Sequence, residues 1–239
     1  MNRNELNKFN SIGYENFSDQ YIFNPLSDFL IPIFRFFNFT PNQITSLSAI
    51  FNLSSLCFYI NNYLYCSSIL YFIGYLLDCV DGRYARKYNL GSTYGMMLDQ
   101  VTDVVTNTPF NIIILSSKLY RGDIISFILI VLVTDLLMIS FSLEEAYSCI
   151  EKNNHDDFYN CKKLLILDNQ DDSYIILYNI FLLINKNIHD KYIKFIDNQD
   201  YKHNANIFIK KNIIEESFKY FIEFGTGNYC MFIIFMILN

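Results

Sequence analysis

Four aspartates lie close together in the stretch "DCVDGRYARKYNLGSTYGMMLDQVTD", residues 78–103. Asp78 and Asp81 are three residues apart, and Asp99 and Asp103 are four apart, so each pair shares one face of a helix. Carboxylates on one face repel each other, most strongly where water is excluded. Carboxylate oxygens suit Mg²⁺ or Mn²⁺, and two such ions can be bridged by shared carboxylates. The spacing therefore predicts a site for Mg²⁺ or Mn²⁺, with two ions, provided that the two helices are neighbours.

Small residues and one arginine accompany these carboxylates. The loop "KYNLGST" between the two aspartate pairs is short enough to make their helices neighbours. Gly82, Ala85 and Gly95 leave the wall beside the carboxylates nearly bare, so a ligand can approach the backbone there. Arg86, one turn beyond Gly82, offers a planar fork of donors to a phosphate. This combination suits a diphosphate substrate and predicts phosphoryl transfer assisted by metal ions.

The overall composition indicates a membrane protein. Of the 239 residues, 52% are hydrophobic and only 18% are charged, which is too apolar for an ordinary soluble domain. The net charge of −6 is concentrated in the motif and in one polar region, so no nucleic-acid partner is expected. The six cysteines show no metal-ligand spacing and are interpreted as reduced and structural.

Several helices must position the motif. Residues 1–21 are polar and contain no apolar signal-peptide core, so insertion must use internal spans. Residues 22–39 are apolar but interrupted by prolines and charges, which predicts a segment lying on the membrane surface. The "INNY" turn between the first two spans predicts an antiparallel hairpin. The four-span core, residues 44–143, is expected to contain spans at 44–60, 63–77, 95–117 and 124–142.

The pattern is less regular after residue 143. Polar stretches at 144–173 and 186–216 alternate with apolar ones at 173–185 and 218–239. The first apolar stretch is short for a span, and the second contains an acid and two glycines. We therefore assign two less certain C-terminal spans to residues 144–239.

Taken together, these segments predict one membrane domain over residues 1–239. Its expected fold class is all-α: a polytopic bundle of about six transmembrane helices with an N-terminal interfacial helix. Basic residues are more numerous on the face that carries Arg35 and Arg83 than on the face with Lys118 and Arg121. The predicted spans lead us to expect a multi-pass integral membrane protein. By the positive-inside rule, its active site is expected to face the cytoplasm.

The motif resembles the signature of the CDP-alcohol phosphotransferase (class-I CDP-alcohol phosphatidyltransferase) family. The pattern Asp-x-x-Asp-Gly-x-x-Ala-Arg, then eight residues, then Gly-x-x-x-Asp-x-x-x-Asp, is matched at every specified position from residue 78 to 103. "TPNQIT", which precedes the first span, is similar to a Pro-Asn-x-x-Thr stretch found in many members. The resemblance implies a six-helix core, usually a homodimer, that moves a phospho-alcohol group from a CDP-alcohol donor to a lipid or small alcohol acceptor and releases CMP.

The resemblance also implies roles for individual residues. Asp78, Asp81 and Asp99 would be metal ligands, and Asp103 would contact metal and act as the base that deprotonates the acceptor hydroxyl. The residues that would line the CDP pocket are Gly82, Ala85, Arg86 and Gly95.

The choice of substrate is left open by the sequence. The N-terminal stretch from Tyr14 to Thr45 resembles the entry to the choline and ethanolamine phosphotransferases, which favours CDP-choline or CDP-ethanolamine with diacylglycerol. The alternative is CDP-diacylglycerol with inositol or glycerophosphate, and a third reading is an inactive member that serves as a binding or partner subunit. Asn42 and Thr45 are interpreted mainly as helix-start chemistry. Asp135 is left outside the site as an acid facing the bundle interior or a neighbouring subunit.

Overall fold

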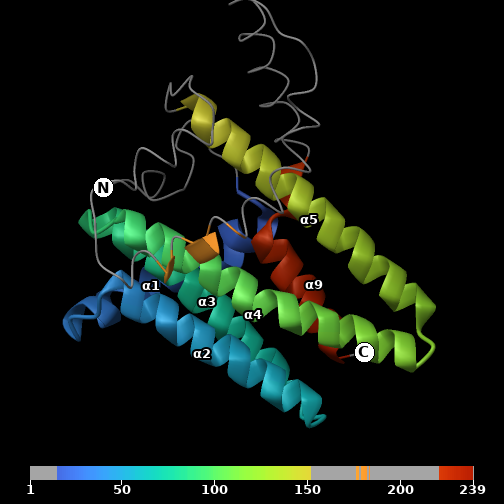
Figure 1. Ribbon diagram of the computed structural model, residues 1–239. Helices are drawn as coiled ribbons and strands as arrows, with labels where there is room; N and C mark the ends of the chain where they lie inside the picture. Colours follow the sequence, from blue (N-terminus) through green and yellow to red (C-terminus); the bar gives the residue numbers. More distant parts are fainter. Residues whose placement is uncertain (1–14, 152–175, 178, 182, 184–220, 239) are drawn as a thin grey trace, which may run out of the picture.

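The computed structural model describes residues 15–151, 176–177, 179–181, 183 and 221–238. Within these ranges the chain is helical and contains no strand, as the sequence predicted (Figure 1). Helix α3 lies in the middle and contacts α1, α2 and α9, while α5 contacts α4 and α9. The elements in chain order are η2 (Asp19–Phe23), α1 (Asn24–Phe36), α2 (Pro41–Ile60), α3 (Leu64–Tyr88), α4 (Thr93–Tyr120), α5 (Ile124–Glu151), η3 (Ile222–Phe224) and α9 (Thr226–Leu238).

Helix α1 is the segment that the sequence places on the membrane surface. Pro25 stands in its first turn, where the missing N–H has no helical partner to lose. Ser27 and Ile31 are fully buried, whereas Phe29 and Phe36 are exposed. This division into an inner and an apolar outer face fits an interfacial helix.

The start of α2 is defined by a capping box at Thr40. The Thr40 hydroxyl accepts a hydrogen bond from the Gln43 backbone N–H, and the Gln43 side chain accepts one from the Thr40 N–H. This reciprocal pair satisfies two backbone donors that the helix leaves unpaired. At the other end, Asn62 adopts a left-handed conformation with φ of 61° and turns the chain back into α3. The predicted antiparallel hairpin is therefore confirmed.

Small polar residues hold this hairpin together. The Ser48 hydroxyl donates to the Gly74 carbonyl at 2.9 Å, and the Ser55 hydroxyl donates to the Ser67 carbonyl at 2.7 Å. Asn52 lies directly against the bare backbone of Gly74. Small residues let two helices approach closely where lipid removes the hydrophobic drive for association.

Helix α3 is longer than the span that the sequence predicted at 63–77. It continues through the first half of the motif to Tyr88 and ends where Asn89 adopts a left-handed conformation with φ of 52°. Asn tolerates this conformation, which ends helices by turning the backbone away. After a short loop, the Ser92 hydroxyl accepts a hydrogen bond from the Gly95 N–H at 3.0 Å and caps α4. Both aspartate pairs therefore lie on helices, with only this loop between them.

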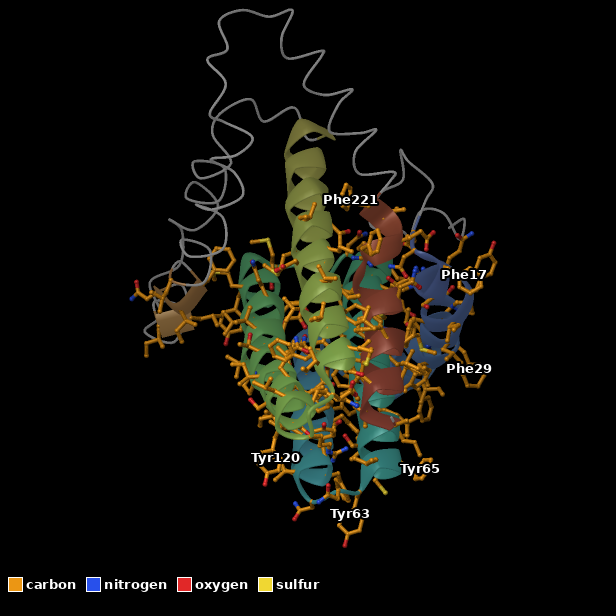
Figure 2. All side chains as sticks on the ribbon, turned by 90° about the vertical axis from the view of Figure 1, so that its right-hand side faces the viewer. Phe17, Phe29, Tyr63, Tyr65, Tyr120 and Phe221 are labelled. Carbon is orange, nitrogen blue, oxygen red and sulfur yellow. The ribbon has the colours of Figure 1, made fainter. Side chains whose placement is uncertain are left out.

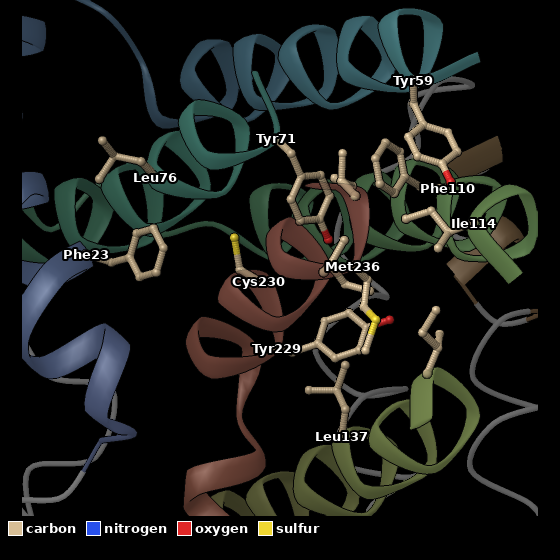
Figure 3. Close-up of a cluster of buried hydrophobic side chains, with 13 residues drawn as sticks. Phe23, Tyr59, Tyr71, Leu76, Phe110, Ile114, Leu137, Tyr229, Cys230 and Met236 are labelled. Atoms are coloured by element: carbon tan, nitrogen blue, oxygen red, sulfur yellow. The ribbon is translucent and has the colours of Figure 1, made fainter. Parts of the chain in front are cut away.

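The main buried cluster is built by α2, α3, α4, α5 and α9, together with Phe23 of η2 (Figure 3). Tyr71 of α3 stacks on Phe110 of α4, with ring centroids 4.8 Å apart and an angle of 18° between the planes. Tyr229 and Ile233 bring α9 into the same cluster, 158 and 162 residues after Tyr71 in the chain. The C-terminal helix is thus part of the core that supports the motif.

Among the helices that the structure describes, two, α2 and α3, are long and apolar enough to cross a membrane by length and composition. Shorter apolar helices occupy Ile124–Ser140 and Thr226–Leu238. The predicted helices at 95–117 and 124–142 are present as α4 and α5. Residues 1–14, 152–175, 178, 182, 184–220 and 239 lie outside the described residues. Most of the predicted polar stretches and more than half of the predicted segment 173–185 fall within these ranges.

Exposed aromatic side chains mark one end of the bundle. Tyr63, Tyr65 and Tyr120 gather where the α2–α3 and α4–α5 turns lie, and Phe17 lies toward the opposite end (Figure 2). Aromatic rings with one polar atom favour the boundary between lipid and water. Their positions suit a bundle whose long helices run across a membrane.

Candidate metal centre

Three of the four motif aspartates come together between α3 and α4. Asp78, Asp99 and Asp103 each offer an oxygen atom, and these three oxygens all lie within 4.8 Å of one another. All three side chains are half-buried. Three carboxylates this close repel one another unless a cation or protons neutralise them. The donor set consists of hard oxygens and fits a divalent ion such as Mg²⁺ or Mn²⁺.

The fourth aspartate, Asp81, points to a different partner. Its Oδ2 accepts a hydrogen bond of 2.5 Å from the Thr45 hydroxyl of α2. Both residues are buried, with exposed fractions of 4% and 3%. The Thr45 hydroxyl also lies 3.2 Å from the Pro41 carbonyl, but its single hydrogen can serve only one acceptor at a time. Sequence reasoning placed Thr45 mainly in helix-start chemistry, and this contact gives it a second role at the motif.

Both motif glycines that were expected to leave room for a ligand lie against polar side chains. A Cβ atom at Gly82 would stand 3.4 Å from the nearest guanidinium nitrogen of Arg86, so the arginine folds over the bare face of the glycine. Ala85 is half-buried on the same helix. A Cβ atom at Gly95 would stand 3.0 Å from Asn42 Oδ1, which shows how closely the starts of α2 and α4 approach. The motif glycines therefore mark two sites of close approach.

A cavity of about 360 Å³ opens beside this approach of α2 and α4. Its walls come from the loop between α1 and α2 and from the loop between α3 and α4. None of the four aspartates lines this cavity, so the carboxylate cluster lies outside it. The lining residues are Arg35, Asn38, Phe39, Thr40, Pro41, Asn42, Leu90 and Ser92.

An ion pair ties the interfacial helix to the motif helix. Arg83 of α3 is almost fully buried, and its guanidinium donates to Asp28 Oδ1 of α1 at 2.8 Å through Nη2 and at 3.2 Å through Nε. Arg83 occupies a position that the family pattern leaves unspecified. Its contact shows how α1 is held against the end of α3 that carries the carboxylates.

A polar clasp joins the N-terminal segment to α3 and α9. The Tyr75 hydroxyl lies 2.8 Å from both Asp19 Oδ1 and Thr226 Oγ1. Gly227 provides the space, because a Cβ atom there would collide with the Asp19 carboxyl. Burial raises the pKa of Asp19 to about 6, although hydrogen bonds from Tyr75 and Asn16 oppose the shift. Sequence reasoning read the glycines of 218–239 only as interruptions of a span.

Two further residues complete the comparison with the sequence. Asp135 is exposed on α5, so the suggestion that it faces the bundle interior is wrong, and it is not part of the carboxylate cluster. Asn107, which the sequence reading passed over, contacts Asp103 from one turn further along α4. The four-residue spacing from Asp103 to Asn107 was the available signal, since it continues the spacing from Asp99 to Asp103.

Known proteins resemble the chain over the same region. The family model described as CDP-alcohol phosphatidyltransferase matches residues 38–165, more than half of the chain. A CDP-diacylglycerol–inositol 3-phosphatidyltransferase of Arabidopsis thaliana is 41% identical over 58 residues, covering 24% of this chain and 25% of the relative. The enzyme of the same name from Drosophila melanogaster is 40% identical over 67 residues, covering 28% of this chain and 30% of the relative.

The matched stretches thus span between a quarter and a third of the curated relatives' length. No solved structure matches the chain. The extent of the family match, together with the carboxylates that the fold assembles from the motif, decides the classification. The chain belongs to the CDP-alcohol phosphatidyltransferase family.

Proposed function

We propose that this protein transfers the phosphatidyl group of CDP-diacylglycerol to a hydroxyl of inositol or a similar small polyol and releases CMP. The observation that carries the proposal is the grouping of Asp78, Asp99 and Asp103 within 4.8 Å at the family motif. Such a cluster is of little use to the fold, because three neighbouring carboxylates destabilise it unless a cation is bound.

The reaction exchanges one phosphorus–oxygen bond for another. The acceptor oxygen forms a bond to the phosphorus that carries the lipid, the bond from that phosphorus to the CMP oxygen breaks, and the acceptor hydroxyl loses its proton. A divalent ion bound by the aspartates would neutralise the diphosphate oxygens. Asp103 receives the proton, since a hydroxyl held beside such a site is easier to deprotonate. Asp81 is assigned to the same ligand set, with its Thr45 hydrogen bond fixing its orientation.

The donor is held by the bare side of the motif. Arg86 lies over Gly82, where its guanidinium can pair with a phosphate oxygen. Ala85 and Gly95 are the other small residues of the motif, and the nucleotide part of the donor is assigned to the surface beside them.

The preference for CDP-diacylglycerol and inositol rests on the relatives. Both relatives described above are named CDP-diacylglycerol–inositol 3-phosphatidyltransferases, and the matched part includes about a quarter of each chain. The competing assignment is CDP-choline or CDP-ethanolamine with diacylglycerol. Its support is the N-terminal stretch, which packs through Asp19 and Asp28 onto the helix that carries the motif.

The membrane arrangement follows from the same family. We assign a multi-pass bundle of about six spans with the carboxylates toward the cytoplasm, and a homodimer as the assembled form. The exposed tyrosines at the end with the α2–α3 turn, away from the motif, support a boundary on that side. Cysteine labelling from either side of sealed vesicles, at Ser92 and Asn61 replaced singly by Cys, tests this orientation.

CMP release by the purified full chain in lipid nanodiscs tests the activity. CDP-diacylglycerol with inositol is expected to yield CMP in the presence of Mg²⁺ or Mn²⁺, and chelation should abolish the release. Asp103→Asn is expected to lower the rate at least about 100-fold. Asp135→Asn, which changes an exposed acid away from the cluster, is the matched control and should retain the rate.

Three outcomes separate the assignments. CMP release with CDP-choline or CDP-ethanolamine plus diacylglycerol, and none with inositol, would transfer the assignment to those substrates. CMP release that does not exceed the background of empty nanodiscs with any donor would identify an inactive member that acts as a binding or partner subunit. Equal rates for wild type and Asp103→Asn would remove Asp103 from its role.

A further inference from the structure

Beyond the carboxylate cluster, toward the C-terminal end of α4, the polar face of the helix continues with the side-chain amide of Asn107. Asp99, Asp103 and Asn107 follow one another at intervals of four residues and therefore share one face of the helix. Asn107 lies one turn further from the start of α4 than Asp103, toward the apolar interior. A half-buried amide at such a depth needs hydrogen-bond partners.

Asn107 connects Asp103 to a tyrosine on another helix. Its Nδ2 donates to Asp103 Oδ1 at 3.5 Å, and its Oδ1 accepts a hydrogen bond of 3.2 Å from the Tyr71 hydroxyl. Chemistry fixes the amide orientation, because the opposite orientation would place the amide oxygen against a carboxylate. Tyr71, Asn107 and Asp103 therefore form a row of hydrogen-bonded side chains. Its hydrogen bonds run in one direction, from the Tyr71 hydroxyl through Asn107 to Asp103.

Tyr71 is held rigidly at the other end of this row. Its ring stacks on Phe110, and only 4% of the residue is exposed (Figure 3). A phenol buried among apolar side chains keeps a hydrogen-bond partner for its hydroxyl, and here that partner is Asn107. The position of the ring therefore determines where the amide of Asn107 can lie.

We propose that Tyr71 and Asn107 are positioning residues that hold the Asp103 carboxylate in the orientation required for ion binding and proton transfer. Asp103 is repelled by Asp78 and Asp99, so without a donor on its far side its side chain would rotate away from them. With Oδ1 engaged by Asn107, Oδ2 faces an ion or an acceptor hydroxyl. The long 3.5 Å contact is of the kind that shortens once substrate is bound.

The kinetic part of this inference rests on the proposed function, so its test has a second readout that does not. Mn²⁺ binding to the full chain in nanodiscs, without substrates, is measured by electron paramagnetic resonance. Tyr71→Phe removes only the hydroxyl and keeps the stacked ring. We expect it to weaken Mn²⁺ binding about 10-fold and to lower kcat by about 10-fold, with the KM for the donor changed less than about 2-fold.

Tyr59→Phe is the matched control. Tyr59 is another buried tyrosine of the same cluster, and its ring centroid lies 6.0 Å from that of Phe110. This variant loses a tyrosine hydroxyl from the same buried cluster, at a residue that is not one of Tyr71, Asn107 and Asp103. Mn²⁺ binding and kcat are expected to stay at the wild-type level in this variant.

Changes at Asn107 test the middle of the row. Asn107→Leu keeps a similar volume but removes both polar groups, and it should reduce Mn²⁺ binding and kcat at least as much as Tyr71→Phe. Asn107→Gln retains an amide and is expected to recover part of both. If Asn107→Leu does not fold, Tyr71→Phe and Tyr59→Phe still decide the question.

The outcomes are distinct. If Tyr71→Phe has wild-type Mn²⁺ binding and wild-type kcat, the inference is overturned. This holds even if the melting temperature of the variant is lower than that of wild type. If the wild type releases no CMP from any donor, the proposed function fails, and the Mn²⁺ measurement alone decides whether the row positions Asp103. Weaker binding in Tyr71→Phe but not in Tyr59→Phe upholds it.

Discussion

The Thr45 hydroxyl of α2 donates to Asp81 Oδ2 of α3 at 2.5 Å, across 36 residues of chain. A hydrogen bond to a carboxylate is among the stronger ones in proteins, and burial of both partners removes the competition from water. This contact fixes one carboxylate of the motif to the neighbouring helix, while the other three face one another. The orientation of the motif therefore depends on a residue outside it.

Replacing Thr45 by valine tests this contact. The side chain keeps its shape but Asp81 loses the Thr45 hydroxyl as a donor, so we expect a loss of about 1–3 kcal/mol in stability, measured as a lower melting temperature in detergent. Thr45→Ser keeps the hydroxyl and should lose less. Ser46→Ala, one residue further on the exposed side of α2, is the control and should change little. A valine variant as stable as wild type would show that the contact is dispensable.

Gly74 is expected to be intolerant of even a methyl group. A Cβ atom there would collide with the Asn52 side chain, with Cγ at 2.7 Å, and would stand 3.2 Å from the Asn52 backbone nitrogen. Gly74→Ala should push α2 and α3 apart and cost about 1–3 kcal/mol, again read from the melting temperature. Gly91→Ala, where a Cβ atom meets nothing within 4 Å, should be neutral. Equal melting temperatures for the two variants would contradict the tight packing.

Loss of Asp28 should loosen the interfacial helix. Arg83 is buried, so Asp28→Ala removes one partner of a charge that water reaches poorly. Asp28 is itself 27% exposed, and we therefore expect the lower end of the range for broken buried pairs, about 3 kcal/mol. Limited proteolysis in the loop after α1 measures the release directly. Arg35→Gln, on the exposed side of the same helix and stacked on Tyr88, should cost less than about 1 kcal/mol.

The Asp19 clasp predicts a pH dependence of stability. The pKa of Asp19 is about 6 in the folded protein and 3.8 in its ordinary state, so folding favours the protonated form. Its stabilising contribution is complete below about pH 3.8 and is lost as the pH rises through about 6. The melting temperature of wild type, relative to that of Asp19→Asn, should therefore fall between about pH 3.8 and pH 6 and level off at higher pH. Glu15 acts on the same carboxyl, so Glu15→Gln is measured in parallel, and a constant difference across this range would contradict the assignment.

Much of the candidate site could be read from residue types and local spacing. Asp99 and Asp103, four residues apart, share a helix face in any α-helix, and the caps at Thr40 and Ser92 act on backbone groups of their own first turn. The hairpin of α2 and α3 followed from two apolar runs joined by a turn too short for any other arrangement. The end of α3 was harder, because hydropathy falls at the motif while the helix continues to Tyr88.

Contacts between distant residues could not be predicted in this way. Nothing in the order of residues relates Thr45 to Asp81, Tyr71 to Asn107 or Asp28 to Arg83, since these pairs depend on how the helices are rotated and how closely they approach. These rotations also determine which three of the four motif aspartates come together in one cluster. By itself the sequence determined the helices, their caps, the family and the carboxylates; only the tertiary structure decided which carboxylates meet and what holds them, because helix rotation and approach are set by packing across the whole bundle.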